Sequence, residues 1–203
     1  MASEVTWPEK RVRLVQQTSF PEEARTSIIV HSENPVEFVL RVRAPHWAER
    51  IAVSVNGRPE RVAAEGDGYL ALNRTWKSRD RVEVSLPMTL REEPVAGSPE
   101  LATLAYGPLV LACQMGRDGL SRDMIEGSLG PKMDRLAPVP MPKFETGHDA
   151  GKETKNGVQW AKKNEDEELR FRTAGQAQDF GLKPLYRVMD ERYSVYWQRG
   201  SKA

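Results

Sequence analysis

Apolar residues alternate with polar or small ones in three short runs near the middle of the chain, at residues 51–55, 70–72 and 82–86. A period of two places one set of side chains on a single face of a pleated strand, so each run predicts a strand buried on one side. Asn56-Gly57 follows the first run and suits the positive φ angles of a tight hairpin. The pattern therefore predicts antiparallel strands and favours the all-β fold class.

Strand and turn signals continue through the rest of the chain. Gly66-Asp67-Gly68 predicts a second reversal, and the continuously apolar run at residues 109–113 predicts a strand covered on both faces. We expect an antiparallel β-sandwich of the jelly-roll-like type, with a second, smaller C-terminal β-domain. The further strands are expected at residues 11–18, 27–30, 38–42, 101–106, 109–113, 158–160, 169–173, 184–189 and 193–197.

The composition changes after Met115, where Gly, Pro, Lys and Asp become frequent and aromatic residues scarce. Proline occupies alternate positions in the segment 137–142, a pattern that favours an extended connector. We therefore expect a β-sandwich domain at residues 1–115, a Pro/Gly-rich connector at 116–157 and a small β-domain at 158–203, packed on the first.

Charge and hydropathy argue against two classes of partner. The 203 residues include 30 Lys plus Arg and 29 Asp plus Glu, so a net charge of +1 supplies no field that would attract nucleic acid or an anionic membrane. No apolar run approaches the roughly 20 residues that a membrane span needs, and the N-terminus does not have the pattern of a signal peptide. We expect no nucleic-acid partner and no membrane partner.

The residues that usually carry catalysis or bind metals are sparse and scattered. Cys113 is the only cysteine, and its apolar neighbours predict an inert core thiol. The histidines at 31, 46 and 148 lack metal-binding spacing. Adjacent acidic pairs such as Glu92-Glu93 point to opposite faces of an extended chain, which suits solvated edge charges better than a glycosidase pair. We predict no catalytic residue, no metal site and no cofactor.

Sugars commonly bind by stacking on exposed aromatic rings, while polar side chains bond the hydroxyl groups. Trp47 and Trp76 stand at predicted strand ends, where a ring can face solvent, and His46 lies beside Trp47. Core packing is the competing role for each ring, because a sandwich of this size needs large side chains in its interior. The candidate carbohydrate-binding residues are Trp47, Tyr69, Trp76, Tyr196 and His46.

Several segments occur together in an order that resembles the β-sandwich portion of glycoside hydrolase family 127, the bacterial β-L-arabinofuranosidase-like enzymes. The resemblance extends from Val5 to Trp197 and includes the small C-terminal β-domain of those enzymes. It departs from the family at Ser78-Arg79-Asp80, where a glycine often precedes the aspartate. The segments that carry it are 40–48, 55–57, 68–69, 74–76, 80–82, 86–88, 106–110, 182–186 and 192–197.

The resemblance implies that catalysis belongs to an α/α toroid that precedes these β-domains and holds a glutamate acid/base, a cysteine nucleophile and a zinc ion. Nothing in this sequence matches the toroid, so no catalytic residue is carried over. The leading hypothesis is a noncatalytic accessory region that supports the toroid and contacts plant polysaccharide or oligosaccharide. Such a region should expose an apolar surface where the toroid is absent.

Two other hypotheses remain open at this point: a free-standing carbohydrate-binding module, and an independent hydrolase with unfamiliar chemistry. A homodimer contact is a further expectation for the accessory role. The resemblance places the protein in a bacterium, and the sequence leaves the cytoplasm and the periplasm open as its location.

Overall fold

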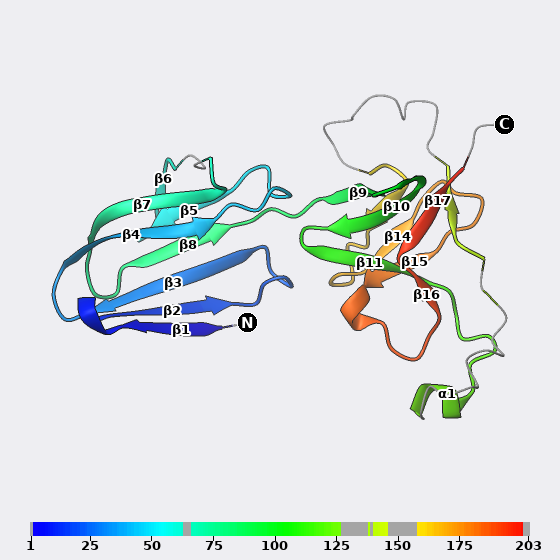
Figure 1. Ribbon diagram of the computed structural model, residues 1–203, viewed down its shortest axis with the longest axis horizontal. Helices are drawn as coiled ribbons and strands as arrows, with labels where there is room; N and C mark the ends of the chain where they lie inside the picture. The colour runs from blue at the N-terminus through cyan, green and yellow to red at the C-terminus, as the bar shows by residue number, and fades with distance from the viewer. Residues whose placement is uncertain (1, 63–65, 127–137, 139, 146–157, 201–203) are drawn as a thin grey trace. The chain divides into compact units, whose positions relative to one another are not determined.

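The computed structural model describes residues 2–62, 66–126, 138, 140–145 and 158–200. The chain folds as two compact units, an N-terminal unit, Met1–Thr89, and a C-terminal unit, Leu90–Ala203. In the described residues of both units, the regular secondary structure is almost entirely β-strand (Figure 1). The predicted all-β fold class is confirmed.

The described part of the N-terminal unit forms two antiparallel sheets. The larger sheet has six strands in the order β1-β2-β3-β8-β5-β6, and the smaller sheet pairs β4 with β7. A short 3-10 helix, η1 (Pro8–Lys10), separates the first two strands. The strands are β1 (Ser3–Trp7), β2 (Val12–Thr18), β3 (Arg25–Ser32), β4 (Val36–Arg43), β5 (Ala52–Val55), β6 (Arg58–Glu60), β7 (Tyr69–Trp76) and β8 (Arg81–Ser85).

One apolar core lies between these two sheets, because the strands of both sheets turn their apolar positions inward. In β8, Val82 and Val84 are 0% and 1% exposed, whereas Glu83 between them is exposed. The predicted β-sandwich is therefore confirmed in this unit. Its buried core consists of Val12, Val30, Phe38, Leu40, Val53, Val55, Leu70, Leu72, Trp76, Val82 and Val84.

Trp76, at the end of β7, is the largest side chain of this core and is 0% exposed. Its ring stacks on that of Phe38 in the neighbouring β4, with centroids 5.6 Å apart. Its Nε1 donates a 3.0 Å hydrogen bond to the backbone carbonyl of Phe38. The indole therefore buries its apolar surface without leaving its polar N–H unpaired.

The Asn56-Gly57 hairpin is present as predicted. The two residues have φ angles of 52° and 75° and join β5 to β6, which pair antiparallel. The neighbour of β5 on its other side is β8, whereas β7, which lies between them in sequence, belongs to the opposite sheet. Alternation thus predicted the buried face of each strand but not the crossing of the chain between sheets.

The described part of the C-terminal unit forms one nine-stranded sheet. Its main path runs β12-β17-β10-β11-β15-β14-β13, with β9 paired to β10 and β16 paired to β11. The β12–β17 pair is parallel and the other pairs are antiparallel. One short helix, α1 (Arg122–Glu126), follows β11. The strands are β9 (Leu90–Val95), β10 (Ser98–Tyr106), β11 (Leu109–Gln114), β12 (Lys143–Phe144), β13 (Ala161–Lys163), β14 (Phe171–Thr173), β15 (Gly181–Pro184), β16 (Tyr193–Ser194) and β17 (Tyr196–Arg199).

Aromatic rings fill the core of this second unit. Trp160 stacks on Phe144 with centroids 4.4 Å apart and meets Trp197 at 5.1 Å. Trp197 is 0% exposed and Phe144 is 1% exposed. Side chains from distant parts of the sequence therefore share one interior.

The observed division of the chain differs from the one expected from composition. It falls between Thr89 and Leu90, because β10 and β11 hydrogen-bond with β17 and β15 of the C-terminal unit. The Pro/Gly-rich stretch lies inside this unit, and its residues 127–137, 139 and 146–157 lie outside the described residues. The segment expected as a strand at 184–189 instead ends β15 and forms a 3-10 helix, η3 (Leu185–Arg187).

We expect Trp76→Ala to lower the free energy of unfolding of the N-terminal unit by about 4 kcal/mol, because it removes a fully buried indole and leaves a cavity. Urea unfolding followed by far-UV circular dichroism measures the change. Val39→Ala, on the same small sheet but 48% exposed, is the matched control and should cost less than about 1 kcal/mol. Equal losses for the two variants would contradict the core position of Trp76.

Gly57→Ala should destabilise the same unit by about 1 kcal/mol, because its φ of 75° is strained for a residue with a Cβ. Gly66→Ala is the control, since an added Cβ there meets nothing within 4 Å and its φ lies outside the positive region. The control should leave stability unchanged or raise it slightly. The midpoints of urea unfolding compare the two variants directly.

Candidate functional site

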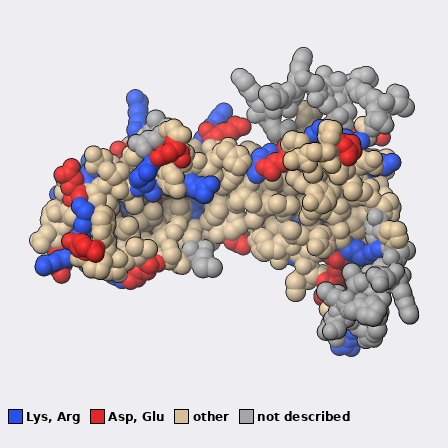
Figure 2. Space-filling view, in the orientation of Figure 1, with Lys and Arg blue, Asp and Glu red and all other residues tan. Residues whose placement is uncertain are grey.

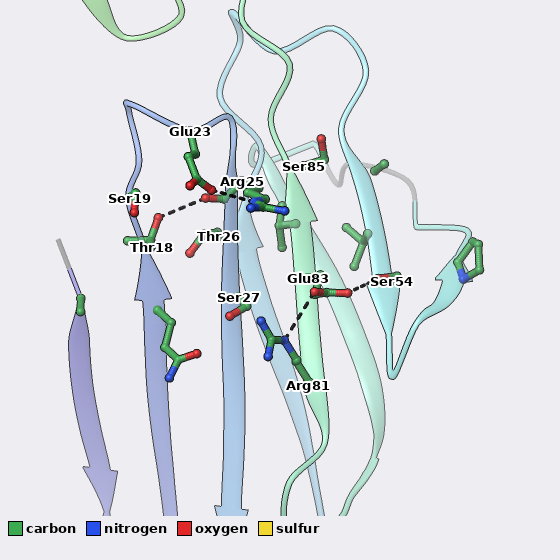
Figure 3. A pocket seen from close by; sticks show the side chains of 16 residues that line it. Thr18, Ser19, Glu23, Arg25, Thr26, Ser27, Ser54, Arg81, Glu83 and Ser85 are labelled. Atoms are coloured by element: carbon green, nitrogen blue, oxygen red, sulfur yellow. Dashed lines mark hydrogen bonds and ion pairs between the residues drawn. The ribbon is translucent and has the colours of Figure 1, made fainter. Parts of the chain in front are cut away.

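An open groove with a volume of about 690 Å³ lies on the N-terminal unit, over the outer face of its six-stranded sheet (Figure 3). This face is turned away from the apolar core, so its strands present their polar positions to the groove. The polar side chains that line it are Gln17, Thr18, Ser19, Glu23, Arg25, Thr26, Ser27, Ser54, Arg81, Glu83 and Ser85.

Strand register brings four of these side chains into one line across the sheet. Gln17 of β2 pairs with Ser27 of β3, Ser27 pairs with Glu83 of β8, and Glu83 pairs with Ser54 of β5. Directly opposed residues of antiparallel strands share a face. We call Gln17, Ser27, Glu83 and Ser54 the polar row. With strands about 4.8 Å apart, it spans roughly 14 Å.

The charged groups of the groove balance one another. Arg25 Nε lies 2.7 Å from a Glu23 carboxylate oxygen, and Arg81 Nε lies 3.4 Å from Glu83. The hydrogen bond to Glu23 raises the pKa of Arg25 above its ordinary value, so this guanidinium stays charged. Figure 2 shows acidic and basic side chains interspersed on the visible face of the N-terminal unit. The groove therefore has no excess of one sign of charge.

Several hydrogen-bonding groups of the groove are available to a ligand. Ser27 is 6% exposed, yet its hydroxyl makes no hydrogen bond within the described part of the chain. The Gln17 amide and the Ser85 hydroxyl also have no side-chain partner among the described residues. Glu83 accepts a 3.4 Å hydrogen bond from the Ser54 hydroxyl. The row thus offers donors and acceptors side by side.

The aromatic candidates from the sequence occupy other places. Trp76 is fully buried, so its ring is not available to stack on a sugar. Trp47 is half-buried in the loop after β4, and its ring stacks on Phe20 with centroids 6.1 Å apart. His46 precedes Trp47 in the same loop. Neither Trp47 nor His46 lines the groove.

The two candidate tyrosines are more exposed. Tyr69 begins β7 and is 37% exposed, but the Arg41 guanidinium lies 4.9 Å from its ring centroid and covers one face. Tyr196 belongs to β17 of the C-terminal unit and is 46% exposed. Among the candidate tyrosine and tryptophan rings, Tyr196 therefore presents the largest exposed fraction to solvent.

A buried polar cluster lies in the C-terminal unit. Lys183 forms an ion pair with Glu191, and their side chains are 9% and 11% exposed. Gln114 Nε2 donates a 3.0 Å hydrogen bond to the same carboxylate. Burial alone would raise the pKa of Glu191, but the hydrogen bonds from Lys183 and Gln114, together with the charges of Lys183 and Arg170, lower it below its ordinary value. The cluster therefore holds a charged pair inside the unit.

Cys113 lies in β11 and is 0% exposed. Burial raises the pKa of its thiol to about 12, which keeps it protonated and unreactive near neutral pH. Its burial in the core was predicted and is confirmed. The described residues contain no group of three His, Cys, Asp or Glu side chains placed to hold a metal ion. In the same residues, no helix has the length and apolar character needed to cross a bilayer.

Two protein families match the chain, in order along its length. The family described as beta-L-arabinofuranosidase, GH127 middle domain, matches residues 1–88. DUF4986, a domain of unknown function, matches residues 91–199. The gap between the matches coincides with the structural division at Thr89 and Leu90. No protein of curated function matches the chain in sequence.

Solved structures of other proteins share the fold of this chain. A glycoside hydrolase with 19% sequence identity superposes with a TM-score of 0.63, over 98% of this chain and 34% of its own. A GH127 β-L-arabinofuranosidase from Geobacillus stearothermophilus T6 has 16% identity and a TM-score of 0.63, over 98% and 32%. A GH127 β-arabinofuranosidase has 18% identity and the same TM-score, over 98% and 33%. The likeness is one of fold, and the chain spans about a third of the length of each.

We expect Glu191→Gln to lower the free energy of unfolding by about 3 kcal/mol at neutral pH, because it leaves the Lys183 ammonium buried without its anion. The lowered pKa of Glu191 means that the contribution of the pair is fully present above the ordinary pKa of 4.5 and is lost as the pH falls through the folded-state value. Urea unfolding at a series of pH values should show the difference from wild type shrinking on acidification. Asp190→Asn, at an exposed neighbour, should follow the wild-type pH profile.

Proposed function

Because the chain belongs to the β-domain region of glycoside hydrolase family 127, as a GH127 middle domain followed by a DUF4986 domain, we propose that it is a noncatalytic accessory region of such an enzyme. Its role is to support a separate catalytic domain and to contact the carbohydrate on which that domain acts. The observation that carries this proposal is the match of both families in order, together with a superposition that covers 98% of this chain and a third of each similar enzyme.

An exposed apolar segment in the C-terminal unit supports the docking role. It follows β15 and includes η3 and the first residue of β16 (Figure 1). Leu185, Tyr186, Met189 and Tyr193 on this segment are between 39% and 68% exposed. Large apolar side chains gathered on a surface mark interaction sites more often than scattered ones do. We call residues 185–193 the apolar segment and propose that it packs against the catalytic domain.

The free-standing carbohydrate-binding module is the second candidate function. The exposed ring of Tyr196 favours it, because an aromatic face open to solvent can stack on a sugar. This candidate predicts that saccharide binding is lost on Tyr196→Ala. The accessory role does not depend on this ring.

The accessory role is tested by mixing the chain with the catalytic region of a family 127 enzyme prepared without its own β-domains. Sedimentation velocity should detect a complex. Leu185→Ser combined with Met189→Ser should weaken that complex about tenfold, because it removes two large apolar contacts. Val5→Ser combined with Val39→Ser, at exposed apolar positions of the N-terminal unit, should leave it unchanged.

The same preparations are assayed on an aryl β-L-arabinofuranoside. We expect the chain alone to release no aryl alcohol above the blank. Hydrolysis by the purified chain would contradict the noncatalytic role. Failure of the folded chain to bind the catalytic region, or binding unaffected by the double serine variant, would contradict docking through the apolar segment.

A further inference from the structure

Ser27 is the feature of the groove that points most directly to a ligand. Its side chain lies in the lining of the groove, on the third strand of the six-stranded sheet (Figure 3). It is 6% exposed and its hydroxyl has no partner within the part of the chain that the structure describes. The hydroxyl oxygen is not among the fully buried side-chain atoms that lack a partner in the described residues, so it is open to the groove, where a polar ligand can reach it and bond to it.

The neighbours of Ser27 supply the other groups that such a ligand needs. Gln17 and Glu83 lie directly opposite it on the two adjacent strands. The Gln17 amide both donates and accepts hydrogen bonds, and the Glu83 carboxylate accepts several. A ligand lying along the polar row therefore meets two groups that donate and accept, Gln17 and Ser27, and one carboxylate acceptor, Glu83, within a row of roughly 14 Å. This length suits a short oligosaccharide.

The charge of the groove selects among ligands of this size. Arg25 and Arg81 are each paired with a glutamate. Their positive charges are therefore already balanced, and the described lining of the groove has no isolated cation that would favour phosphate or a polyanion. The lining contains no aromatic ring and no large apolar side chain other than Val53 and Val84. An uncharged ligand with many hydroxyl groups, each able to donate and accept, matches these groups best.

We propose that the groove over the polar row binds a neutral, hydroxyl-rich oligosaccharide through hydrogen bonds rather than by aromatic stacking. This inference rests on the proposed function, since it assigns a surface to the carbohydrate contact of the accessory region. Ser27 and Gln17 bond ligand hydroxyls at one part of the row, and Glu83 accepts hydrogen bonds from hydroxyls at the other. Arg81 and Ser54 hold the Glu83 carboxylate in place.

The test is calorimetric titration of the full chain with a β-L-arabinofuranosyl disaccharide and with short arabinan, xylan and cellulose fragments. We expect binding of at least one neutral saccharide. Ser27→Ala should weaken it about fivefold and Glu83→Ala about tenfold or more, because they remove a neutral and a charged hydrogen bond respectively. Glu4→Gln, at an ion-paired carboxylate outside the groove, should leave the affinity unchanged. Circular dichroism checks that each variant is folded.

Three results would overturn the proposal: no heat of binding with any neutral saccharide, binding that Ser27→Ala and Glu83→Ala leave unchanged, or binding that only Tyr196→Ala removes. Polygalacturonate fragments are titrated as the acidic comparison, and a preference for them over the neutral fragments would overturn the ligand class. These outcomes are distinct from failure of the accessory role, which is decided by hydrolysis and by sedimentation with the catalytic region. A folded chain that binds the catalytic region but no sugar contradicts only the groove.

Discussion

The burial of Trp76 between two sheets is the interaction on which the N-terminal unit depends. The small sheet has only two strands, β4 and β7, and a pair of strands is marginal unless its apolar face is covered. Trp76 is the largest side chain that the small sheet buries in this core, and its Nε1 donates a hydrogen bond to the carbonyl of Phe38 on the neighbouring strand. The larger sheet can turn its polar face outward because its other face is buried against this core.

The alternating pattern predicted most strands of this unit, although not β1 or β6, and it did not predict which strands pair. A period of two in Val82, Glu83 and Val84 fixes which side chains are buried, whatever strand lies alongside. It carries no information on whether β7 stays in the sheet of β5 or crosses to the other one. The boundary between the two units could not be predicted from the sequence for a related reason. Residues 109–113 look like any buried strand, and only their pairing with β15 assigns them to the C-terminal unit.

The candidate site was harder to predict than the fold. The sequence analysis proposed aromatic rings as the binding residues. In the structure Trp76 is buried in the core, and the ring of Phe20 stacks on that of Trp47. The polar row comes from positions 17, 27, 54 and 83, each of which has the pattern of an ordinary solvent-facing strand residue. Strand register brings them together, and register depends on pairings between distant segments. Only the unusual burial of Ser27 distinguishes the row from a plain exposed face, and burial is a property of the folded chain.

The apolar segment and the polar row, the two surfaces proposed for the accessory role, bind their partners through different interactions. Apolar side chains such as Met189 gain free energy when any well-fitting protein surface excludes water from them, so the apolar segment favours a large and permanent partner. Hydrogen-bonding groups exchange water for ligand at little net gain, so the polar row favours a weak and reversible one. The proposed accessory role combines lasting attachment to a catalytic domain with reversible contact with glycan, and so uses both surfaces. The separation of the apolar segment and the polar row into two units, each with its own core, lets either surface change without disturbing the interior that supports the other.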